Sequence, residues 1–222
     1  MKTLIGLSLA IVVVASGCFG GRARAIYTAQ DETPPSEPQR WSFDIEPADA
    51  IMLVGTVFSG TWEVRAEVDA PSLPNVLCQT GKAPFPALSL GGAVFGDVIL
   101  TTRFKPIGGR EDQAAGLIFR VQDQDNYYIL RANVLENNVN FYKYASGTRS
   151  SLKEASAPVK AGQWQELRAD VMGNRFRGFV NGQQVVEATD SSYQAGQVGL
   201  WTKADSVTCF DDVEARLPES AE

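Results

Sequence analysis

Apolar and polar residues alternate in short segments along most of the chain after Trp41, and these segments are rich in β-branched and aromatic residues. A two-residue period places successive side chains on opposite faces of an extended strand. No stretch shows a convincing helical period. The pattern therefore predicts strands at residues 61–67, 97–104, 115–121, 126–132, 138–144, 164–171, 175–180, 184–188, 196–201 and 208–215.

Turn residues between these segments predict how the strands connect. Asn181-Gly182 is the strongest hairpin signal, because a type I′ turn needs positive φ at both central residues. Asn137-Asn138 is interpreted as a second hairpin turn, and Asp123–Asn126 as a third. Ten or more antiparallel strands in one domain predict an all-β fold, a two-sheet antiparallel jelly-roll sandwich.

Residues 1–25 are typical of a signal peptide, with an uncharged, mostly apolar stretch from Leu4 to Ala15. That stretch is too short to span a bilayer, which takes about 20 residues. Residues 15–18 are similar to a bacterial lipobox ending at Cys18, although Ala15 stands where leucine is usual. Residues 23–25 instead fit ordinary signal cleavage, in which case Cys18 is removed.

The remainder divides into a leader, one domain and a tail. Residues 26–40 are polar and proline-rich, which predicts a disordered tether. Residues 41–217 are globular in composition and numerous enough for one core. Residues 218–222 form the tail. Either processing route predicts an extracytoplasmic domain, lipid-anchored to a bacterial membrane or secreted or periplasmic.

Composition excludes several classes of function. The 222 residues contain no histidine, which excludes a Ser-His-Asp triad, an imidazole general base and His-ligated zinc. The net charge of −6 becomes −9 for residues 26–222, because the first 25 residues hold three basic side chains and no acid. This acidity argues against nucleic acid and against anionic membrane surfaces. A lipid on Cys18 is the only membrane contact expected.

Cys78 and Cys209 remain when Cys18 is set aside. Two cysteines in an oxidising compartment favour one disulfide, and the first and last strands of a sandwich often lie together. The alternative is two separately buried thiols, which behave as small apolar side chains.

Seven segments carry a family resemblance: Gly116–Arg120, Asp125–Arg131, Asn138–Tyr142, Gly162–Arg168, Phe179–Val185, Gly196–Trp201 and Phe210–Val213. Together they resemble concanavalin A-like lectin/glucanase domains. They are most similar to secreted bacterial domains described as 3-keto-disaccharide hydrolase-like or family-16-glycoside-hydrolase-like. The resemblance covers residues 41–217 and implies a concanavalin A-like sandwich. It implies little about activity, since this fold serves binders as well as enzymes.

The sequence offers little support for catalysis. Family-16 glycosidases carry Glu-x-Asp-x-x-Glu or Glu-x-Asp-x-Glu on one strand, with the carboxyl groups of a retaining enzyme about 5 Å apart. This chain has neither motif, and Glu63, Glu67 and Asp69 have the wrong spacing. Cleavage beside a 3-keto group, which the closer resemblance implies, requires a base. Without histidine, an Asp, Glu, Lys or Tyr side chain would have to serve, and Glu136 is one candidate.

A binding function requires aromatic faces and planar polar groups along a sheet. A turn at Asn137-Asn138 predicts Asn133 opposite Tyr142 and Arg131 opposite Tyr144. The two-residue period then predicts a polar face of Arg131, Asn133, Asn140, Tyr142 and Tyr144, backed by apolar Leu130, Ala132, Val134, Val139 and Phe141. The polar face suits a concave sheet that grips a ligand. The alternative is a solvated face on which Arg131 stacks on Tyr144.

Four further residues join the candidate ligand-binding set. Arg120 and Tyr128 lie on either side of the Asp123–Asn126 turn, which leaves their register open. Trp201 and Lys203 lie near the end of a late strand, where a sandwich groove commonly opens. The alternative for Trp201 is a core aromatic.

Asp123 and Asp125 offer oxygen ligands to a calcium ion. Ca²⁺ takes 6–8 oxygen ligands, so a second loop would have to contribute. The alternative is a set of Asx turns that closes the hairpin. No other cofactor is expected.

The sequence thus favours a non-catalytic extracytoplasmic domain that binds a saccharide or glycan. The first alternative is a glycoside hydrolase acting on 3-keto-disaccharides or related glycans. The second is a structural envelope protein that binds another protein.

Overall fold

The computed structural model describes residues 35, 37–44 and 55–219. The predicted signal peptide, Cys18 and most of the predicted tether lie outside the described residues. Within the described part, no helix has the length and hydropathy needed to cross a bilayer.

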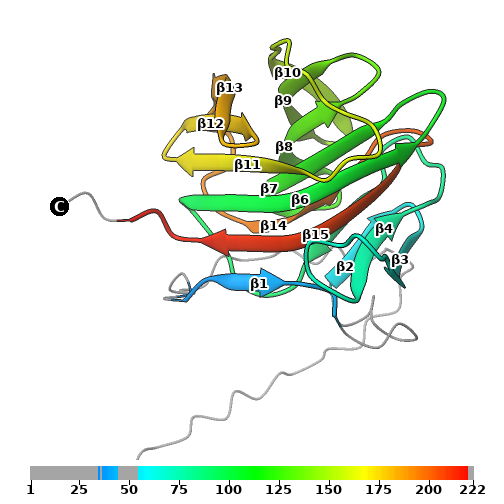
Figure 1. Cartoon of the computed structure of the whole chain (residues 1–222). Helices are drawn as coiled ribbons and strands as arrows, with labels where there is room; N and C mark the ends of the chain where they lie inside the picture. Colours follow the sequence, from blue (N-terminus) through cyan, green and yellow to red (C-terminus); the bar gives the residue numbers. More distant parts are fainter. Residues whose placement is uncertain (1–34, 36, 45–54, 220–222) are drawn as a thin grey trace, which may run out of the picture.

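In the part of the chain that the structure describes, fifteen strands form two antiparallel sheets (Figure 1). Sheet A has the strand order β13-β12-β11-β6-β15-β4-β3, with β1 paired to β15, and sheet B has the order β10-β9-β8-β7-β14-β5-β2. The long strands β6 and β15 lie side by side in sheet A. The strands are β1 (Gln39–Trp41), β2 (Gly55–Ser59), β3 (Trp62–Ala66), β4 (Asn75–Gln79), β5 (Ala87–Leu90), β6 (Val98–Gly108), β7 (Ala114–Asp123), β8 (Asn126–Asn133), β9 (Asn138–Ala145), β10 (Thr148–Lys153), β11 (Gln165–Met172), β12 (Arg175–Val180), β13 (Gln183–Thr189), β14 (Gln197–Trp201) and β15 (Val207–Arg216).

The main core lies between the two sheets. Alternate residues of strands in both sheets point inward, among them Leu100, Phe104 and Phe210 of sheet A and Leu117, Leu130 and Phe141 of sheet B. Burial of each such side chain contributes about 1.5–3 kcal/mol. The predicted two-sheet sandwich is confirmed, and the predicted apolar set beside the candidate face belongs to this core or packs against it.

Every strand predicted from the alternation overlaps a strand of the structure, but β1, β2, β4, β5 and β10 were missed. Two physical reasons explain most of the misses. All the residues of β4 and β5 are buried, so these strands show no polar alternation. Strand β10 is a polar edge strand with no buried residue.

The predicted disulfide is confirmed. Cys78 on β4 and Cys209 on β15 are direct partners across the two strands, and the bond joins residues 131 positions apart. It lies on the outer face of sheet A, where Val76, Ala70 and Trp164 pack around it.

The Asn181-Gly182 hairpin is confirmed, since both residues have positive φ between β12 and β13. The strand register predicted for the hairpin between β8 and β9 was wrong. Asn133 pairs with Asn138, and Arg131 with Asn140. The chain reverses earlier than predicted because Asn133 Oδ1 accepts the N–H groups of Leu135 and Glu136. The predicted pairing differs from the observed one by an even number of residues, so the predicted side chains still lie on the same face of the sheet.

Candidate functional site

The outer face of sheet B carries a second cluster of buried side chains, separate from the main core. Tyr127, Tyr142 and Trp201 form its aromatic part, and Phe58, Phe85 and Tyr144 pack against them while remaining partly exposed. Alternation explains the placement, because the residues between these positions on the same strands point into the sandwich. The cluster therefore lies on the side of the sheet that faces away from sheet A.

Gly116 and Phe85 determine how Trp201 lies on this face. Trp201 pairs with Gly116 across β14 and β7, and a Cβ on Gly116 would lie 3.2 Å from the indole Cε3. The missing side chain leaves room for the ring. Phe85 stacks on the other side of Trp201 at 5.8 Å between ring centroids and meets Tyr144 edge-on at 5.6 Å. Trp201 is consequently fully buried.

A pocket of about 270 Å³ opens at the Tyr127 end of this face. Tyr127 and Tyr144 stack at 4.9 Å and supply part of its wall. Burial, followed by the charge of Asp125, raises the pKa of Tyr144, so its hydroxyl remains a hydrogen-bond donor above neutral pH. The pocket is lined by Phe58, Ser59, Pro84, Phe85, Ala87, Gln124, Asp125, Tyr127 and Tyr144.

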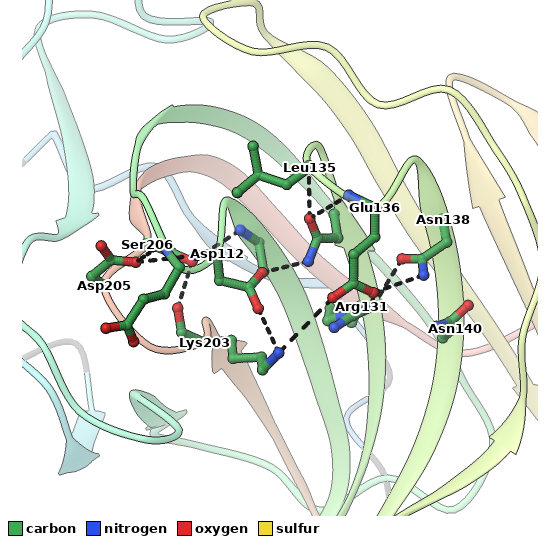
Figure 2. Close-up of polar contacts among 12 residues, drawn as sticks. Asp112, Arg131, Leu135, Glu136, Asn138, Asn140, Lys203, Asp205 and Ser206 are labelled. Carbon is green, nitrogen blue, oxygen red and sulfur yellow. Dashed lines mark hydrogen bonds and ion pairs between the residues drawn. The ribbon is translucent and has the colours of Figure 1, made fainter.

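A network of charged and amide side chains occupies the opposite end of the same face (Figure 2). Asp112 lies just before β7 and is 1% exposed. One of its carboxylate oxygens accepts a hydrogen bond from Asn133, and the other lies 2.7 Å from the Lys203 ammonium. The backbone N–H of Asp112 is itself held by the Asp205 carboxylate.

Arg131 and Glu136 form the second half of the network. The Arg131 guanidinium donates to Glu136 Oε2 at 2.6 Å and to Asn138 Oδ1 at 2.8 Å, and Figure 2 shows the three side chains converging. Lys203 lies 3.9 Å from the other Glu136 oxygen and so links the two halves. Burial raises the pKa of Glu136, but the hydrogen bonds from Arg131 and Asn138 outweigh it and leave the pKa below its usual value. Glu136 is thus ionised and paired with Arg131 and Lys203, and its lowered pKa makes it a weaker base than an ordinary glutamate.

Asn140 and Tyr142 lie between the network and the pocket. Asn140 donates to the Tyr142 hydroxyl at 2.8 Å and accepts the N–H of Ala155. The guanidinium groups of Arg131 and Arg149 approach the Tyr142 ring, at 5.3 and 4.4 Å from its centroid. Tyr142 is 6% exposed, so most of its ring is covered before any ligand arrives.

The structure brings most of the candidate ligand-binding residues onto one face: Arg131, Asn133, Asn140, Tyr142, Tyr144, Trp201 and Lys203. Within that face their accessibility differs. Tyr144 is partly exposed beside the pocket, whereas Trp201 is a fully buried floor residue. The rings that remain accessible on this face are therefore those of Tyr144, Phe85 and Phe58.

Arg120 and Tyr128 lie elsewhere, so including them in this face was an error of placement. Arg120 has a φ of 49° in a bulge of β7, and its guanidinium turns inward to the carbonyls of Gly96 and Gly173. Tyr128 shares the inward parity of Leu130 and donates to Asp190 at 2.5 Å. Burial and the bond to Asp190 raise the pKa of Tyr128 to about 12. Both side chains stabilise the end of the sandwich.

Asp123 and Asp125 lie at the β7–β8 turn. Asp123 Oδ1 accepts the Asp125 N–H and the Asn126 side-chain amide, which is an Asx turn. Among the described residues, no cluster of three or more acidic or cysteine side chains is arranged to hold a metal. The calcium site stays a prediction, and Asp125 contributes instead to the wall of the pocket.

Sequence reasoning missed Phe58, Phe85, Asp112 and Arg149. Phe85 lies between two prolines in a loop, and Asp112 precedes a strand, so no period marks either of them. Arg149 belongs to the unpredicted edge strand β10. Alternation alone would have excluded Tyr128 from the outer face, because it lies two residues from the inward-pointing Leu130.

Comparisons with known proteins agree with this fold. Residues 59–216 match the family of 3-keto-alpha-glucoside-1,2-lyase-like domains. The chain belongs to this family. A levanase of Bacillus subtilis (strain 168) is 29% identical over 103 residues, which are 45% of this chain and 15% of the levanase, so the chain spans a small part of that relative.

Solved structures show the same sandwich. The carbohydrate binding module CBM66 from Bacillus subtilis superposes with a TM-score of 0.63 at 23% identity, covering 72% of this chain and 94% of the module. A putative glycosyl hydrolase from Parabacteroides distasonis gives a TM-score of 0.54 at 14% identity, covering 81% of this chain and all of that one, 100%. At these identities the likeness concerns the fold.

Proposed function

We propose that this domain binds a saccharide on the outer face of sheet B and does not cleave it. The observation that carries the proposal is the pocket walled by Phe58, Phe85, Tyr127 and Tyr144, which adjoins a row of planar polar side chains on the same sheet. Aromatic faces stack on the apolar face of a sugar ring, and fixed polar groups orient its hydroxyls. At about 270 Å³ the pocket lies just below the usual range for ligand pockets, which suits a single sugar unit.

The comparisons support a carbohydrate ligand. The relative with the matching sequence is a levanase, and a carbohydrate binding module shares the sandwich. Levan is therefore the first polysaccharide to try. The Cys78–Cys209 disulfide supports an extracytoplasmic location, because such bonds persist in oxidising compartments. Lipid attachment at Cys18 stays a prediction.

The proposal is tested by titrating the purified chain with levan and a panel of oligosaccharides in a calorimeter. Tyr144→Ala and Phe85→Ala should each weaken binding about tenfold, because each removes an exposed stacking surface. Phe179→Ala is the matched control: it removes a part-buried aromatic ring that lies under Arg168, on the outer face of sheet A. Absence of any glycan binding, or unchanged affinity in both pocket variants, would refute the proposal.

A second function is favoured by one observation. The family takes its description from a lyase acting on 3-keto-glucosides, and two carboxylates, Asp112 and Glu136, flank the Lys203 ammonium. An enzyme would convert a 3-keto-α-glucoside, and chromatography would detect the products. Turnover that disappears in Glu136→Gln would replace the binding proposal with this one. The lowered pKa of Glu136 favours the binder.

A further inference from the structure

Arg149 lies across the centre of the proposed binding face. It sits on the edge strand β10, paired with Tyr144, and its guanidinium carbon lies 4.4 Å from the ring centroid of Tyr142. The ring centroids of Phe85 and Trp201 are 5.1 and 5.8 Å away. The guanidinium thus lies between the network at one end of the face and the pocket at the other.

No described carboxylate lies within ion-pair distance of the Arg149 guanidinium, and Asp112 and Glu136 act on it only from farther away. The neighbouring cations are paired, Arg131 with Glu136 and Lys203 with Asp112. The side chain of Arg149 makes no hydrogen bond or ion pair within the part of the chain that the structure describes. Its Nη1 is buried and has no hydrogen-bond partner there. Contact with the aromatic rings cannot satisfy these donors, because the N–H bonds of a guanidinium lie in its plane.

An unpaired, partly desolvated cation favours an anion. Burial, with a contribution from Arg131, lowers the pKa of Arg149, yet guanidinium groups remain charged throughout the physiological range. Water is a weak substitute once a group is part-buried, and a carboxylate or sulfate offers two oxygens that match the guanidinium fork. The two carboxylates that act on Arg149 are Asp112 and Glu136, and each is already paired with another cation, Asp112 with Lys203 and Glu136 with Arg131.

We propose that Arg149 recognises an anionic substituent, a carboxylate or a sulfate ester, on the saccharide bound to the outer face of sheet B. The inference rests on the proposed function and adds the chemical class of the ligand. The aromatic pocket would hold the ring of the sugar, and Arg149 would hold the anionic group at the edge nearer the network.

Matched pairs of probes test this inference. Oligogalacturonate is compared with its methyl ester, and a carrageenan oligosaccharide with its desulfated form, while levan serves as a neutral reference. The two pairs distinguish a carboxylate from a sulfate. The wild-type chain should bind the anionic member of one pair at least about tenfold more tightly than the neutral member.

Two variants of Arg149 and one control make the test specific. Arg149→Gln should abolish the difference between the paired probes, whereas Arg149→Lys should keep part of the difference, because it keeps the charge without the fork. Arg175→Gln is the control, since Arg175 is an exposed arginine paired with Glu187 on sheet A. Circular dichroism verifies that each variant is folded.

The outcomes separate the two proposals. Equal affinity for both members of each pair, or a difference that survives in Arg149→Gln, overturns the role of Arg149. Binding of levan alone also overturns it and leaves the proposed function standing. No binding of any probe overturns both.

Discussion

The outer faces of the two sheets have the same alternation of side chains but differ in what surrounds their polar groups. On sheet A, Asp170 is 2% exposed and pairs with both Arg168 and Arg177. Lys105 of the same face pairs with Asp69 and Glu67. On sheet B the rings of Phe58, Phe85 and Tyr144 remain partly exposed around a pocket, and Arg149 lies among aromatic rings with no ion pair to a described carboxylate.

The difference shows how a binding face can be told from a solvated one in a sandwich. Both faces contain arginines and aspartates, so composition does not separate them. What separates them is the pocket with its partly exposed rings, because both faces hold a buried arginine nitrogen without a hydrogen-bond partner among the described residues, Arg103 Nε on sheet A and Arg149 Nη1 on sheet B. Sheet A is stapled by a disulfide and pairs Lys105, Arg168 and Arg177 with acids, whereas sheet B leaves ring faces available to a ligand.

The largest expected effect belongs to sheet A. The double variant Cys78→Ala and Cys209→Ala should lower the free energy of unfolding by about 4–5 kcal/mol, since the bond closes a loop spanning 131 positions. Chemical denaturation measures the loss. Glycan affinity of the folded variant should not change, because the bond lies on the other sheet. Equal stability of the variant and the wild-type chain would contradict the assignment.

The second-largest expected effect is a pH dependence of stability that arises from Asp211 on sheet A. Burial raises the pKa of Asp211 to about 6, although Ser72 and Asp212 donate hydrogen bonds to it. Because the folded pKa exceeds the unfolded value of about 3.9, the stability from this group is full below pH 4 and is lost as pH rises through 6. Relative to Asp211→Asn, the wild-type chain should therefore lose about 2–3 kcal/mol between pH 4 and pH 7.

Denaturation of the two proteins across that pH range measures the difference. Asp212→Asn is the control, because it changes the exposed neighbour and should leave most of the pH dependence in place. A difference that does not vary with pH would show that Asp211 titrates near its ordinary value.

The smallest expected effect comes from substituting one buried aspartate on each face, which compares the two faces directly. Asp112→Asn on sheet B and Asp170→Asn on sheet A each replace a buried aspartate that pairs with a cation. Each should cost about 1–2 kcal/mol of unfolding free energy, since an amide keeps one acceptor and loses the charge. Only Asp112→Asn should also change glycan affinity. Equal effects of the two substitutions on affinity would remove the functional distinction between the faces.

The fold was largely predictable, because alternation, turn residues and the two remaining cysteines all report local or simple physical constraints. Strands buried on both faces, such as β4, carry no alternation and were invisible to that signal. The hairpin register failed because one side chain, Asn133, starts the reversal before the Asn-Asn pair that marks its end. Residue type alone does not reveal such a contact.

The site was predictable only in part. Period two placed Arg131, Asn140 and Tyr142 together, since parity survives an even shift of register. It failed at Arg120, where a bulge with positive φ reverses the direction of the side chain. Phe85 and Arg149 reach the face from a loop and an edge strand, and their positions depend on tertiary contacts that leave no local pattern.

The turn between β8 and β9 has a consequence for how this sandwich tolerates insertions. Asn133 pairs with Asn138 and also binds the backbone of the turn, so one amide sets both the length of the loop and the parity of everything that follows it. A slip of the strand pairing by two residues would preserve which side chains face outward, whereas a slip by one would drive Asn140 and Tyr142 into the apolar interior and expose Phe141. Added residues that the loop absorbs leave the pairing unchanged, and those that shift it are tolerated only in even steps.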